Sequence, residues 1–315
     1  MNAAAERPDI AVLLGTYNGA TYLRAQLRSI GSQQLAGGLT PRLTLYVSDD
    51  GSRDDTRAII AEFGAEGTVR VVEGAGPCMG FAENFRHLVL TCGDAHDIYL
   101  FCDQDDLWHA DKLQSAISRL APFANAPAMV CGRTLNIDET GARVGLSPLF
   151  SRQPSFRNAL VQSIAGANTM AFNRLAFALL RRSAGHGPFV SHDWWTYLIV
   201  TGAGGTVIYV PEPTISYRQH AGNVVGANTG LLSRLDRIRR GLRGQFRDWN
   251  QRNIGLLALN SDLLTQENRA VLADFRRARS RLFLAGLPWL LKSGVYRQTL
   301  WSNLHLYAAC AFAKL

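Results

Sequence analysis

Three carboxylates occur within four residues in Asp103-Gln104-Asp105-Asp106, directly after the apolar run Ile98–Phe101. Like charges at this spacing repel one another, so the cluster is costly beside a sheet unless a cation neutralises it. A hard divalent ion such as Mg²⁺ or Mn²⁺ prefers oxygen ligands and commonly bridges substrate phosphates. The cluster therefore indicates a metal and diphosphate site. The structural alternative is a turn in which Asp106 caps a helix that begins at Leu107.

A second acidic pair, Asp49-Asp50, follows the apolar run Leu43–Val47 and precedes Gly51-Ser52. Two carboxylates at such a position can accept hydrogen bonds from the N–H of a pyrimidine base and from ribose hydroxyls. By itself the segment is equally typical of a turn followed by a helix cap.

A third acid, Asp193, lies in Ser191-His192-Asp193-Trp194-Trp195. An acid followed by two tryptophans suits a sugar site, because aromatic faces pack on pyranose C–H surfaces and apolar walls make a carboxylate more basic. The alternative is a helix cap that precedes two aromatic residues of the core. Further along, His220 follows Arg218, and an arginine here could pair with a phosphate. A single histidine is more often a satisfied polar residue than a ligand.

The elements that must position these residues alternate between strand and helix up to about residue 136. The predicted strands are Ile10–Leu14, Leu43–Val47, Val69–Val72, Asp97–Phe101 and Ala128–Asn136, and the predicted helices are Tyr22–Gln33, Asp54–Phe63, Phe81–Leu90 and Lys112–Leu120. This order predicts an α/β fold with a mostly parallel, doubly wound sheet. The polar clusters then lie at the carboxyl ends of strands, where such sheets bind ligands. No dinucleotide or P-loop glycine motif follows the first strand.

The charge of the chain is unevenly distributed. Residues 231–315 hold 15 Lys and Arg against 5 Asp and Glu, whereas residues 1–230 hold 18 against 20. Apolar residues recur every three or four positions over Leu231–Arg252, and Arg276–Arg281 precede the short apolar run Leu282–Leu291. A basic amphipathic region of this kind favours an anionic membrane surface, and packing on the rest of the protein is the alternative. The tail matches no nucleic-acid module, so no nucleic-acid partner is expected.

Composition limits the class of protein. Hydrophobic residues make up 47% of the 315 residues, which is enough for a large core. No apolar run reaches the roughly 20 residues needed to span a bilayer. The five cysteines are scattered without a Cys-x-x-Cys pair, which indicates reduced thiols and a cytoplasmic location.

The chain resembles the family 2 glycosyltransferases, in particular the bacterial rhamnosyltransferases that build O-antigen and related surface polysaccharides. The resemblance covers about residues 8–226. It rests on five motifs in this order: Thr16-Tyr17-Asn18-Gly19, Asp49-Asp50-Gly51-Ser52, Asp103-Gln104-Asp105-Asp106, His192-Asp193-Trp194-Trp195 and Tyr217-Arg218-Gln219-His220. Each motif alone is common, and the ordered set is specific.

The resemblance implies a GT-A fold over residues 1–226 and a metal-dependent, inverting transfer from a nucleotide sugar. The charge distribution and the apolar spacing described above predict a basic, mainly helical region over residues 227–315. It implies a role for each motif residue. The nucleotide contacts are Thr16, Tyr17, Asn18, Asp49, Asp50 and Asp103; the metal contacts are Asp105, Asp103 and His220; the general base is Asp193; the sugar or acceptor contacts are His192, Trp194, Trp195 and Arg218. Many relatives carry Glu-Asp where this chain has His192-Asp193. The Gln-x-x-Arg-Trp motif of processive synthases is absent, which favours transfer of one or a few sugars.

The donor implied is TDP-L-rhamnose, and the acceptor is a glycan, lipid-linked and reached from the inner face of the cell membrane. Two alternatives remain open. The first is the same reaction with a UDP-sugar of galactose, glucose or galactofuranose. The second is a catalytically silent binding module with the same fold, against which the intact acidic motifs argue.

Overall fold

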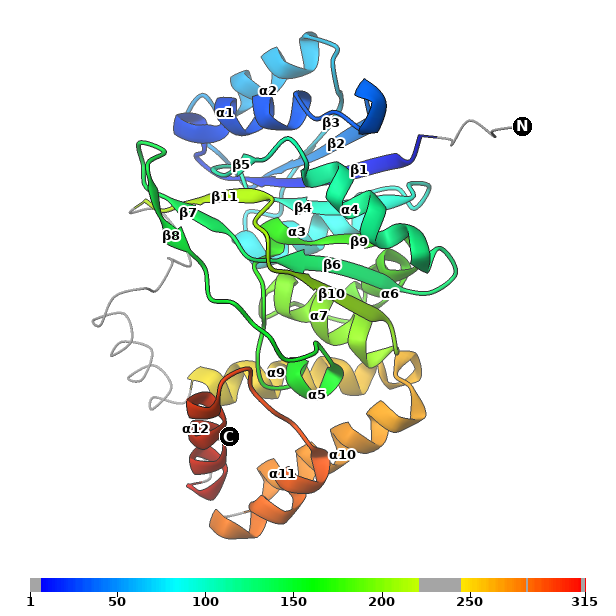
Figure 1. The fold of residues 1–315 in the computed structure, drawn as a ribbon, viewed down its shortest axis with the longest axis vertical. Coiled ribbons are helices and arrows are strands. Elements are labelled where there is room, and N and C mark those ends of the chain that lie inside the picture. The colour runs from blue at the N-terminus through cyan, green and yellow to red at the C-terminus, as the bar shows by residue number, and fades with distance from the viewer. Residues whose placement is uncertain (1–6, 221–244, 282, 313–314) are drawn as a thin grey trace.

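The computed structural model describes residues 7–220, 245–281, 283–312 and 315. Its centre is a seven-stranded sheet in the order β10-β6-β9-β4-β1-β2-β3 (Figure 1). The strands are β1 Asp9–Thr16, β2 Arg42–Asp49, β3 Arg70–Ala75, β4 Ile98–Cys102, β6 Ala128–Gly132, β9 Ala171–Asn173 and β10 Thr206–Val210. Strand β9 pairs antiparallel with both neighbours, and the other pairings in this sheet are parallel. The predicted α/β fold with a mostly parallel sheet is confirmed.

Helices cover both faces of the sheet because its central strands are apolar throughout. In β1 the side chains alternate: Ile10, Val12 and Leu14 lie in one hydrophobic cluster, and Ala11 and Leu13 lie in the other. A continuous apolar run is what a parallel strand buried on both faces requires. The helices that follow the strands are α1 Ala20–Gly31, α2 Thr56–Ala65, α3 Phe81–Thr91, α4 Lys112–Leu120, α5 Phe156–Ala159, α6 Arg174–Ala184 and α7 His192–Gly202.

A second, four-stranded sheet lies beside the first, in the order β5-β11-β7-β8. Its strands are β5 Leu107–Trp108, β7 Leu135–Ile137, β8 Arg143–Leu146 and β11 Ile215–Arg218. Sequence predicts one strand over Ala128–Asn136, and this is wrong, because the structure divides the segment into β6 and β7 in different sheets. The break falls at Gly132, where a Cβ atom would lie 2.5 Å from the carbonyl oxygen of Val210.

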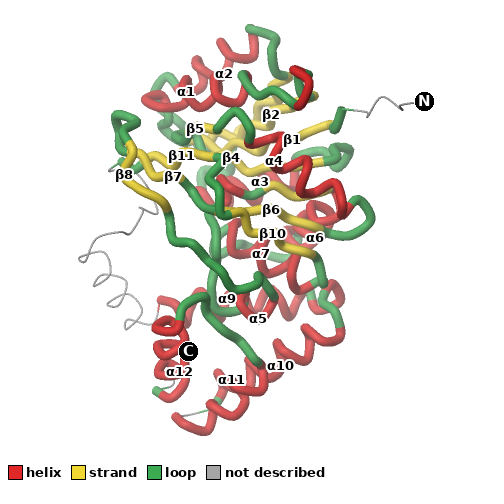
Figure 2. Tube along the Cα trace, in the orientation of Figure 1, coloured by secondary structure: helices red, strands yellow, loops and turns green. Residues whose placement is uncertain are grey.

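The C-terminal region is helical, as predicted, in the part that the structure describes. It contains α9 Gln245–Leu259, α10 Gln266–Ser280, a 3-10 turn at Phe283–Gly286, α11 Leu287–Ser293 and α12 Leu300–Ala311. These helices gather at the end of the molecule opposite α1 and α2 (Figure 2). Their buried apolar residues belong to the same hydrophobic cluster as Ala11 and Leu13 of β1. The predicted boundary at residue 226 lies outside the described residues.

The amphipathic stripe predicted over 231–252 is described only from residue 245 onward. In that part, the ring of Phe246 stacks on Trp194 with centroids 6.1 Å apart, whereas Trp249 is 39% exposed. At Phe246 the stripe therefore packs on the rest of the protein. Among the described residues, no helix combines the length and the apolar character needed to cross a bilayer.

Candidate active site

The acidic loops meet because β2, β1 and β4 are parallel neighbours in the sheet. Thr16 at the end of β1 pairs with Asp49 of β2, and Leu14 pairs with Cys102 of β4. The carboxyl ends of the three strands are thus level, and ligands of open α/β sheets bind at such edges. Sequence correctly predicts this gathering from strand order alone.

Gln104 joins the loop after β1 to the acidic loop after β4. Its side-chain Oε1 accepts a hydrogen bond from the backbone N–H of Tyr17 at 2.8 Å, and its Nε2 donates to the carbonyl of Tyr17 at 3.0 Å. The amide passes so close to Gly19 that a Cβ atom there would lie 2.2 Å from Oε1. The exposed side chains of Tyr17 and Asn18 are therefore held at a fixed distance from the acidic loop.

Thr16 and Asp49 are anchors of these loops. Thr16 is 1% exposed, and its hydroxyl donates to Oδ1 of Asp49. Ser52 and Arg57 also donate to this carboxylate. Burial alone would raise the pKa of Asp49, but the hydrogen bonds from Ser52, Arg57 and Thr16 outweigh it and lower the pKa. Of the predicted nucleotide contacts, Tyr17 and Asn18 are the ones with exposed side chains.

Asp50 fixes the loop that leads from β3 to α3. Its Oδ1 accepts a hydrogen bond from the backbone N–H of Cys78 at 2.6 Å, and its Oδ2 accepts one from Gly80 at 2.8 Å. The carboxylate is 8% exposed. Asp50 thus shapes the edge of the site, and each of its oxygens already holds a backbone partner.

The predicted metal residues come together. Nε2 of His220 lies 2.8 Å from Oδ2 of Asp105, and both side chains are 15% exposed. The pKa of Asp103 is raised well above its ordinary value, first by burial and then by the negative charges of Asp106, Asp105 and Asp193. Several carboxylates that raise one another's pKa mark a site where a cation would be stabilising.

Arg218 supports the acidic loop Asp103–Asp106 through hydrogen bonds. Its backbone N–H donates to Oδ1 of Asp106 at 3.1 Å, and its Nε donates to the carbonyl of Asp105 at 3.1 Å. Its Nη1 donates to the carbonyls of Asp138 and Glu139. The residue is 6% exposed, so these contacts position the acidic loop rather than present the guanidinium to a substrate. The predicted sugar or phosphate contact by Arg218 stays a prediction.

Asp106 is a buried support. Its Oδ2 accepts a hydrogen bond from Asn168 at 2.6 Å, and the backbone carbonyl of Asn168 accepts one from Nζ of Lys112 at 2.8 Å. Burial and the charge of Asp105 raise the pKa of Asp106 to about 7, and burial lowers the pKa of Lys112 to about 8. The alternative of a helix cap at Asp106 is wrong, because Leu107–Trp108 form β5 and α4 begins at Lys112.

Asp193 lies in the first turn of α7, after the N-cap Ser191. Burial raises its pKa, although hydrogen bonds from Ser191, from the backbone of Trp194 and from Ser163 oppose the shift. Its charge also raises the pKa of Asp103, so the two carboxylates interact electrostatically. A buried carboxylate with a raised pKa has the basicity that a general base needs.

The family model described as "Glycosyl transferase family 2" matches residues 11–185. The chain belongs to glycosyl transferase family 2. The match covers the central sheet except the start of β1 and all of β10, together with the loops that follow β1, β2 and β4, and it ends before Asp193 and His220.

Relatives of this family 2 glycosyltransferase agree with the assignment. It is 25% identical over 236 residues to the dTDP-rhamnosyl transferase RfbG of Shigella flexneri, which covers 71% of this chain and 78% of that protein. The structure of S. aureus TarS 1–349 in complex with UDP-GlcNAc aligns over 96% of this chain and 81% of that one, with TM-score 0.57 and 14% identity. The mannosyltransferase PcManGT from Pyrobaculum calidifontis, in complex with GDP-Man and Mn²⁺, aligns over 98% and 86%, with TM-score 0.51 and 17% identity. The fold is of the GT-A type.

The tryptophans of the fourth motif do not form the sugar platform that sequence predicts for this glycosyltransferase. Trp195 has no exposed surface and donates through Nε1 to Ser183, and Trp194 is 6% exposed and donates to the carbonyl of Ala159. Both lie in the hydrophobic core, because α7 is buried almost all round. The alternative of a core-facing aromatic pair is correct.

His192 is also buried, at 5% exposure, with its ring stacked on Phe85 at a centroid distance of 3.8 Å. Among the described residues neither ring nitrogen has a hydrogen-bond partner. Burial lowers the pKa of His192 to about 3, so the ring is neutral.

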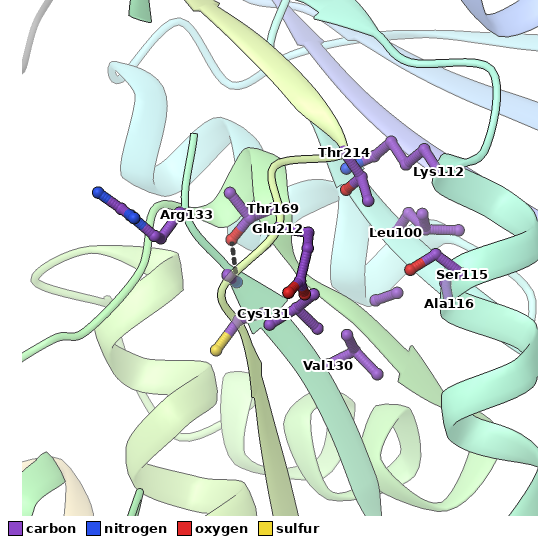
Figure 3. Close-up of a pocket in the computed structure, with 13 residues that line it drawn as sticks. Leu100, Lys112, Ser115, Ala116, Val130, Cys131, Arg133, Thr169, Glu212 and Thr214 are labelled. Carbon is purple, nitrogen blue, oxygen red and sulfur yellow. Dashed lines mark hydrogen bonds between the residues drawn. The ribbon is translucent and has the colours of Figure 1, made fainter. Parts of the chain in front are cut away.

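Sequence reasoning missed Gln104, Lys112 and Asn168 as residues of this glycosyltransferase site. For Gln104 the available signal was its place between two acids, whereas Lys112 and Asn168 gave none. A pocket lined by Lys112, Thr169, Glu212 and Thr214 lies between α4 and the ends of β6 and β10 (Figure 3). None of Asp103, Asp105 and Asp193 lines it, so we assign no substrate to it.

Proposed function

We propose that this enzyme transfers L-rhamnose from dTDP-L-rhamnose to a hydroxyl group of a glycan acceptor, with inversion at the anomeric carbon. The proposal depends on one observation above all. The negative charge of Asp193 raises the pKa of Asp103, as does that of Asp105, and Nε2 of His220 lies 2.8 Å from Oδ2 of Asp105. We infer that these residues belong to one site. One carboxylate can then act as the base while the others face the diphosphate.

The sugar in this proposal rests on the 25% identity to a dTDP-rhamnosyl transferase. The exposed side chains of Tyr17 and Asn18 are the candidate contacts to the nucleotide, supported from below by Thr16, Asp49 and Asp50. Neighbours of known structure are complexes with UDP-GlcNAc, UDP and GDP-Man, which is consistent with a nucleotide-sugar donor of some kind. A UDP-sugar is therefore the alternative in a donor screen.

The residues present fit a divalent cation. Asp105 and His220 offer an oxygen and a nitrogen side by side, and the raised pKa of Asp103 indicates negative charge without compensation. Within the described residues, no group of three or more His, Cys, Asp or Glu forms a ready-made cage, so diphosphate oxygens would complete the coordination. When bound, Mg²⁺ or Mn²⁺ would stabilise the negative charge of the leaving diphosphate.

The reaction follows from the positions of the carboxylates. Oδ of Asp193 accepts the proton of the acceptor hydroxyl as that oxygen forms a bond to the anomeric carbon. The bond from this carbon to the diphosphate breaks, and the electron pair leaves with the diphosphate. A single displacement inverts the carbon, and no carboxylate nucleophile is required. Without a processive-synthase motif, we expect transfer of one or a few sugars.

We place the enzyme in the cytoplasm, peripherally on the inner face of the cell membrane, with a lipid-linked glycan of O-antigen or another surface polysaccharide as its acceptor. The proposed site accepts a sugar hydroxyl, and the 15 Lys and Arg of residues 231–315 favour an anionic surface.

The test is a donor screen on the purified chain. Binding of a donor stabilises the folded state, so thermal shifts with dTDP-L-rhamnose and with UDP-sugars, each with Mn²⁺, rank the donors. Slow divalent-dependent hydrolysis of the same donor then reports catalysis without an acceptor. We expect dTDP-L-rhamnose to give the largest shift and hydrolysis that EDTA stops. A larger shift with a UDP-sugar would replace the donor, and binding without hydrolysis of any donor would indicate the silent module.

A further inference from the structure

Helix α12 exposes several large apolar side chains. From Gln298 to Ala313 the sequence contains no Asp, Glu, Lys or Arg. Four of its large apolar side chains face outward: Leu300 is 83% exposed, Trp301 76%, Leu304 58%, and Phe312, directly after the helix, 67%. Contiguous apolar patches on a protein surface mark sites that bind a partner or a membrane.

The helix has two distinct sides. At about 100° per residue, Leu300, Trp301, Leu304, Ala308 and Phe312 fall within an arc of about 120°. The buried residues Asn303, Leu306 and Cys310 lie on the opposite side. The inner side packs on the 3-10 turn Phe283–Gly286, where a Cβ atom on Gly286 would lie 3.1 Å from Sγ of Cys310. The outer side of α12 is thus a continuous apolar face that extends from the first residue of the helix to Phe312.

We propose that the outer face of α12 inserts into the interface of an anionic lipid bilayer. The charge distribution favours this occupant: the face itself carries no charge, while residues 231–315 of the sequence hold 15 Lys and Arg against 5 Asp and Glu. Arg281, shortly before the turn that packs on α12, is exposed, and so is Lys292 of α11, although its Nζ lies 3.3 Å from Oδ2 of Asp274. Leu284 within the turn is 67% exposed. Tryptophan and leucine on one face, with Lys and Arg beside it, are typical of segments that lie in the membrane interface.

The docking face is rigidly connected to the helix that carries Asp193. Before α12, Arg297 donates to the carbonyl of Val161, and the backbone of Gln298 donates to Gln162. Asn158 of α5 donates to the carbonyl of Tyr296 at 2.9 Å and accepts from the hydroxyl of Tyr197 in α7 at 2.9 Å. A bilayer that holds α12 therefore also fixes the orientation of Asp193 relative to the membrane surface.

This inference is independent of the donor, and it assigns binding to a face other than the stripe predicted over 231–252. The experiment uses the full chain and vesicles of phosphatidylglycerol and phosphatidylethanolamine, with phosphatidylcholine vesicles for comparison. The test variant is Leu300→Ser/Trp301→Ser/Leu304→Ser. The control is Leu259→Ser, which removes an apolar side chain of similar exposure, 64%, from α9. Circular dichroism and donor thermal shifts confirm that both variants are folded.

We expect the triple variant to lose binding to anionic vesicles by about ten-fold or more, because each buried apolar side chain contributes over 1 kcal/mol. The control should bind like the wild type. Part of the wild-type binding should survive high salt, since apolar contacts are not screened. Equal sedimentation of triple variant and wild type would overturn the proposal. So would a wild-type dimer in light scattering that the triple variant dissociates, because a second copy would then cover the face. Donor hydrolysis in solution should be the same in all three, which separates this result from the proposed reaction.

Discussion

His220 Nε2 lies 2.8 Å from Asp105 Oδ2, although 115 residues separate the two in the chain. The small sheet brings them together. Strand β5 begins two residues after Asp105, and β11 ends two residues before His220. The antiparallel pairing of Ser216 with Leu107 then extends toward Asp105 and Arg218. A four-stranded sheet with a two-residue strand thus brings together the two residues that we propose to bind the metal.

The pair of Asp105 and His220 predicts the effect of Asp105→Asn. An amide has nearly the same shape but cannot offset the charge of a divalent cation. We expect loss of most activity and of most divalent-dependent nucleotide binding, measured by donor hydrolysis and by thermal shift with Mn²⁺. The matched control is Asp94→Asn. The Asp94 side chain is 81% exposed and is not among the predicted site residues. Full wild-type activity in excess EDTA would contradict the role of a metal.

Gln104 predicts a coupling between two loops. Gln104→Leu removes both hydrogen bonds to Tyr17, each with a net contribution of about 0.5–1.5 kcal/mol. We expect the donor KM to rise by about 5–100-fold, with a smaller change in kcat at saturating donor. Gly19→Ala should act in the same direction, because its Cβ displaces the Gln104 amide.

The double variant checks this coupling. If both changes act through the same contact, Gly19→Ala should cost little once Gln104 is already leucine, so the two effects will not add. Strict additivity of the two changes in log KM would show that Gly19 and Gln104 affect the donor separately.

The substitution Asp193→Asn tests whether Asp193 is the general base. The amide keeps the shape and cannot accept the proton, so kcat should fall by about 10²–10⁴-fold while donor affinity changes little. Isothermal titration with donor and initial rates at saturating donor give the two quantities independently. If affinity collapses together with kcat, Asp193 binds the donor and is not the base.

The pKa of Asp193 predicts an acidic limb in the pH profile of kcat. Burial raises this pKa above its ordinary value, and the base acts only when deprotonated. Activity should therefore be full above the raised pKa and fall as the pH drops through it, at a higher pH than a solvent-exposed aspartate would give. Rates are measured at saturating metal and donor. The residual activity of Asp193→Asn should lack this limb; its persistence would assign the titration to another group.

Sequence could predict the part of this site that depends on strand order, and it missed the part that depends on other contacts. Loops at the ends of β1, β2 and β4 meet in any parallel sheet, so the grouping of Asp50 with Asp103 and Asp105 follows from the alternation of elements. Two-residue β5 carries no periodicity, and Asn168 reaches Asp106 only through the folded core. The sugar contacts that sequence predicts for Trp194 and Trp195 are wrong, because an aromatic pair has the same sequence pattern whether it faces a sugar or the core. Because α7 is buried on nearly all sides, both tryptophans face the core.

Substitutions of His192 show whether this residue packs in the core or contacts the substrate. Its ring is stacked on Phe85 and meets Phe101 edge-on at 4.9 Å, and its nitrogens have no partner among the described residues. His192→Phe replaces two unpartnered nitrogens by carbon in an aromatic cage. Removing the two unpartnered polar atoms should stabilise the folded state by about 1–3 kcal/mol. The larger phenyl ring should destabilise it by a similar amount, because it overpacks the core. We therefore expect urea unfolding at pH 7 to give a free energy close to that of the wild type, and kcat within a few-fold. His192→Asn, which loses the stacking and keeps the polar group, should be clearly less stable.

The acid dependence of stability makes the test of His192 specific. Its pKa is about 3 in the folded protein, compared with about 6.5 for an unfolded chain. Between these values the unfolded state binds a proton that the folded state does not, so the wild type loses up to about 1.4 kcal/mol of stability per unit as the pH falls. His192→Phe should lack this contribution, and unfolding curves at pH 7 and pH 5 measure the difference. The same acid loss in both proteins would show that His192 is not buried as a neutral ring. If instead stability behaves as expected but kcat collapses in His192→Phe, the unpartnered nitrogens contact the substrate, and His192 belongs with Asp193 in the reacting centre.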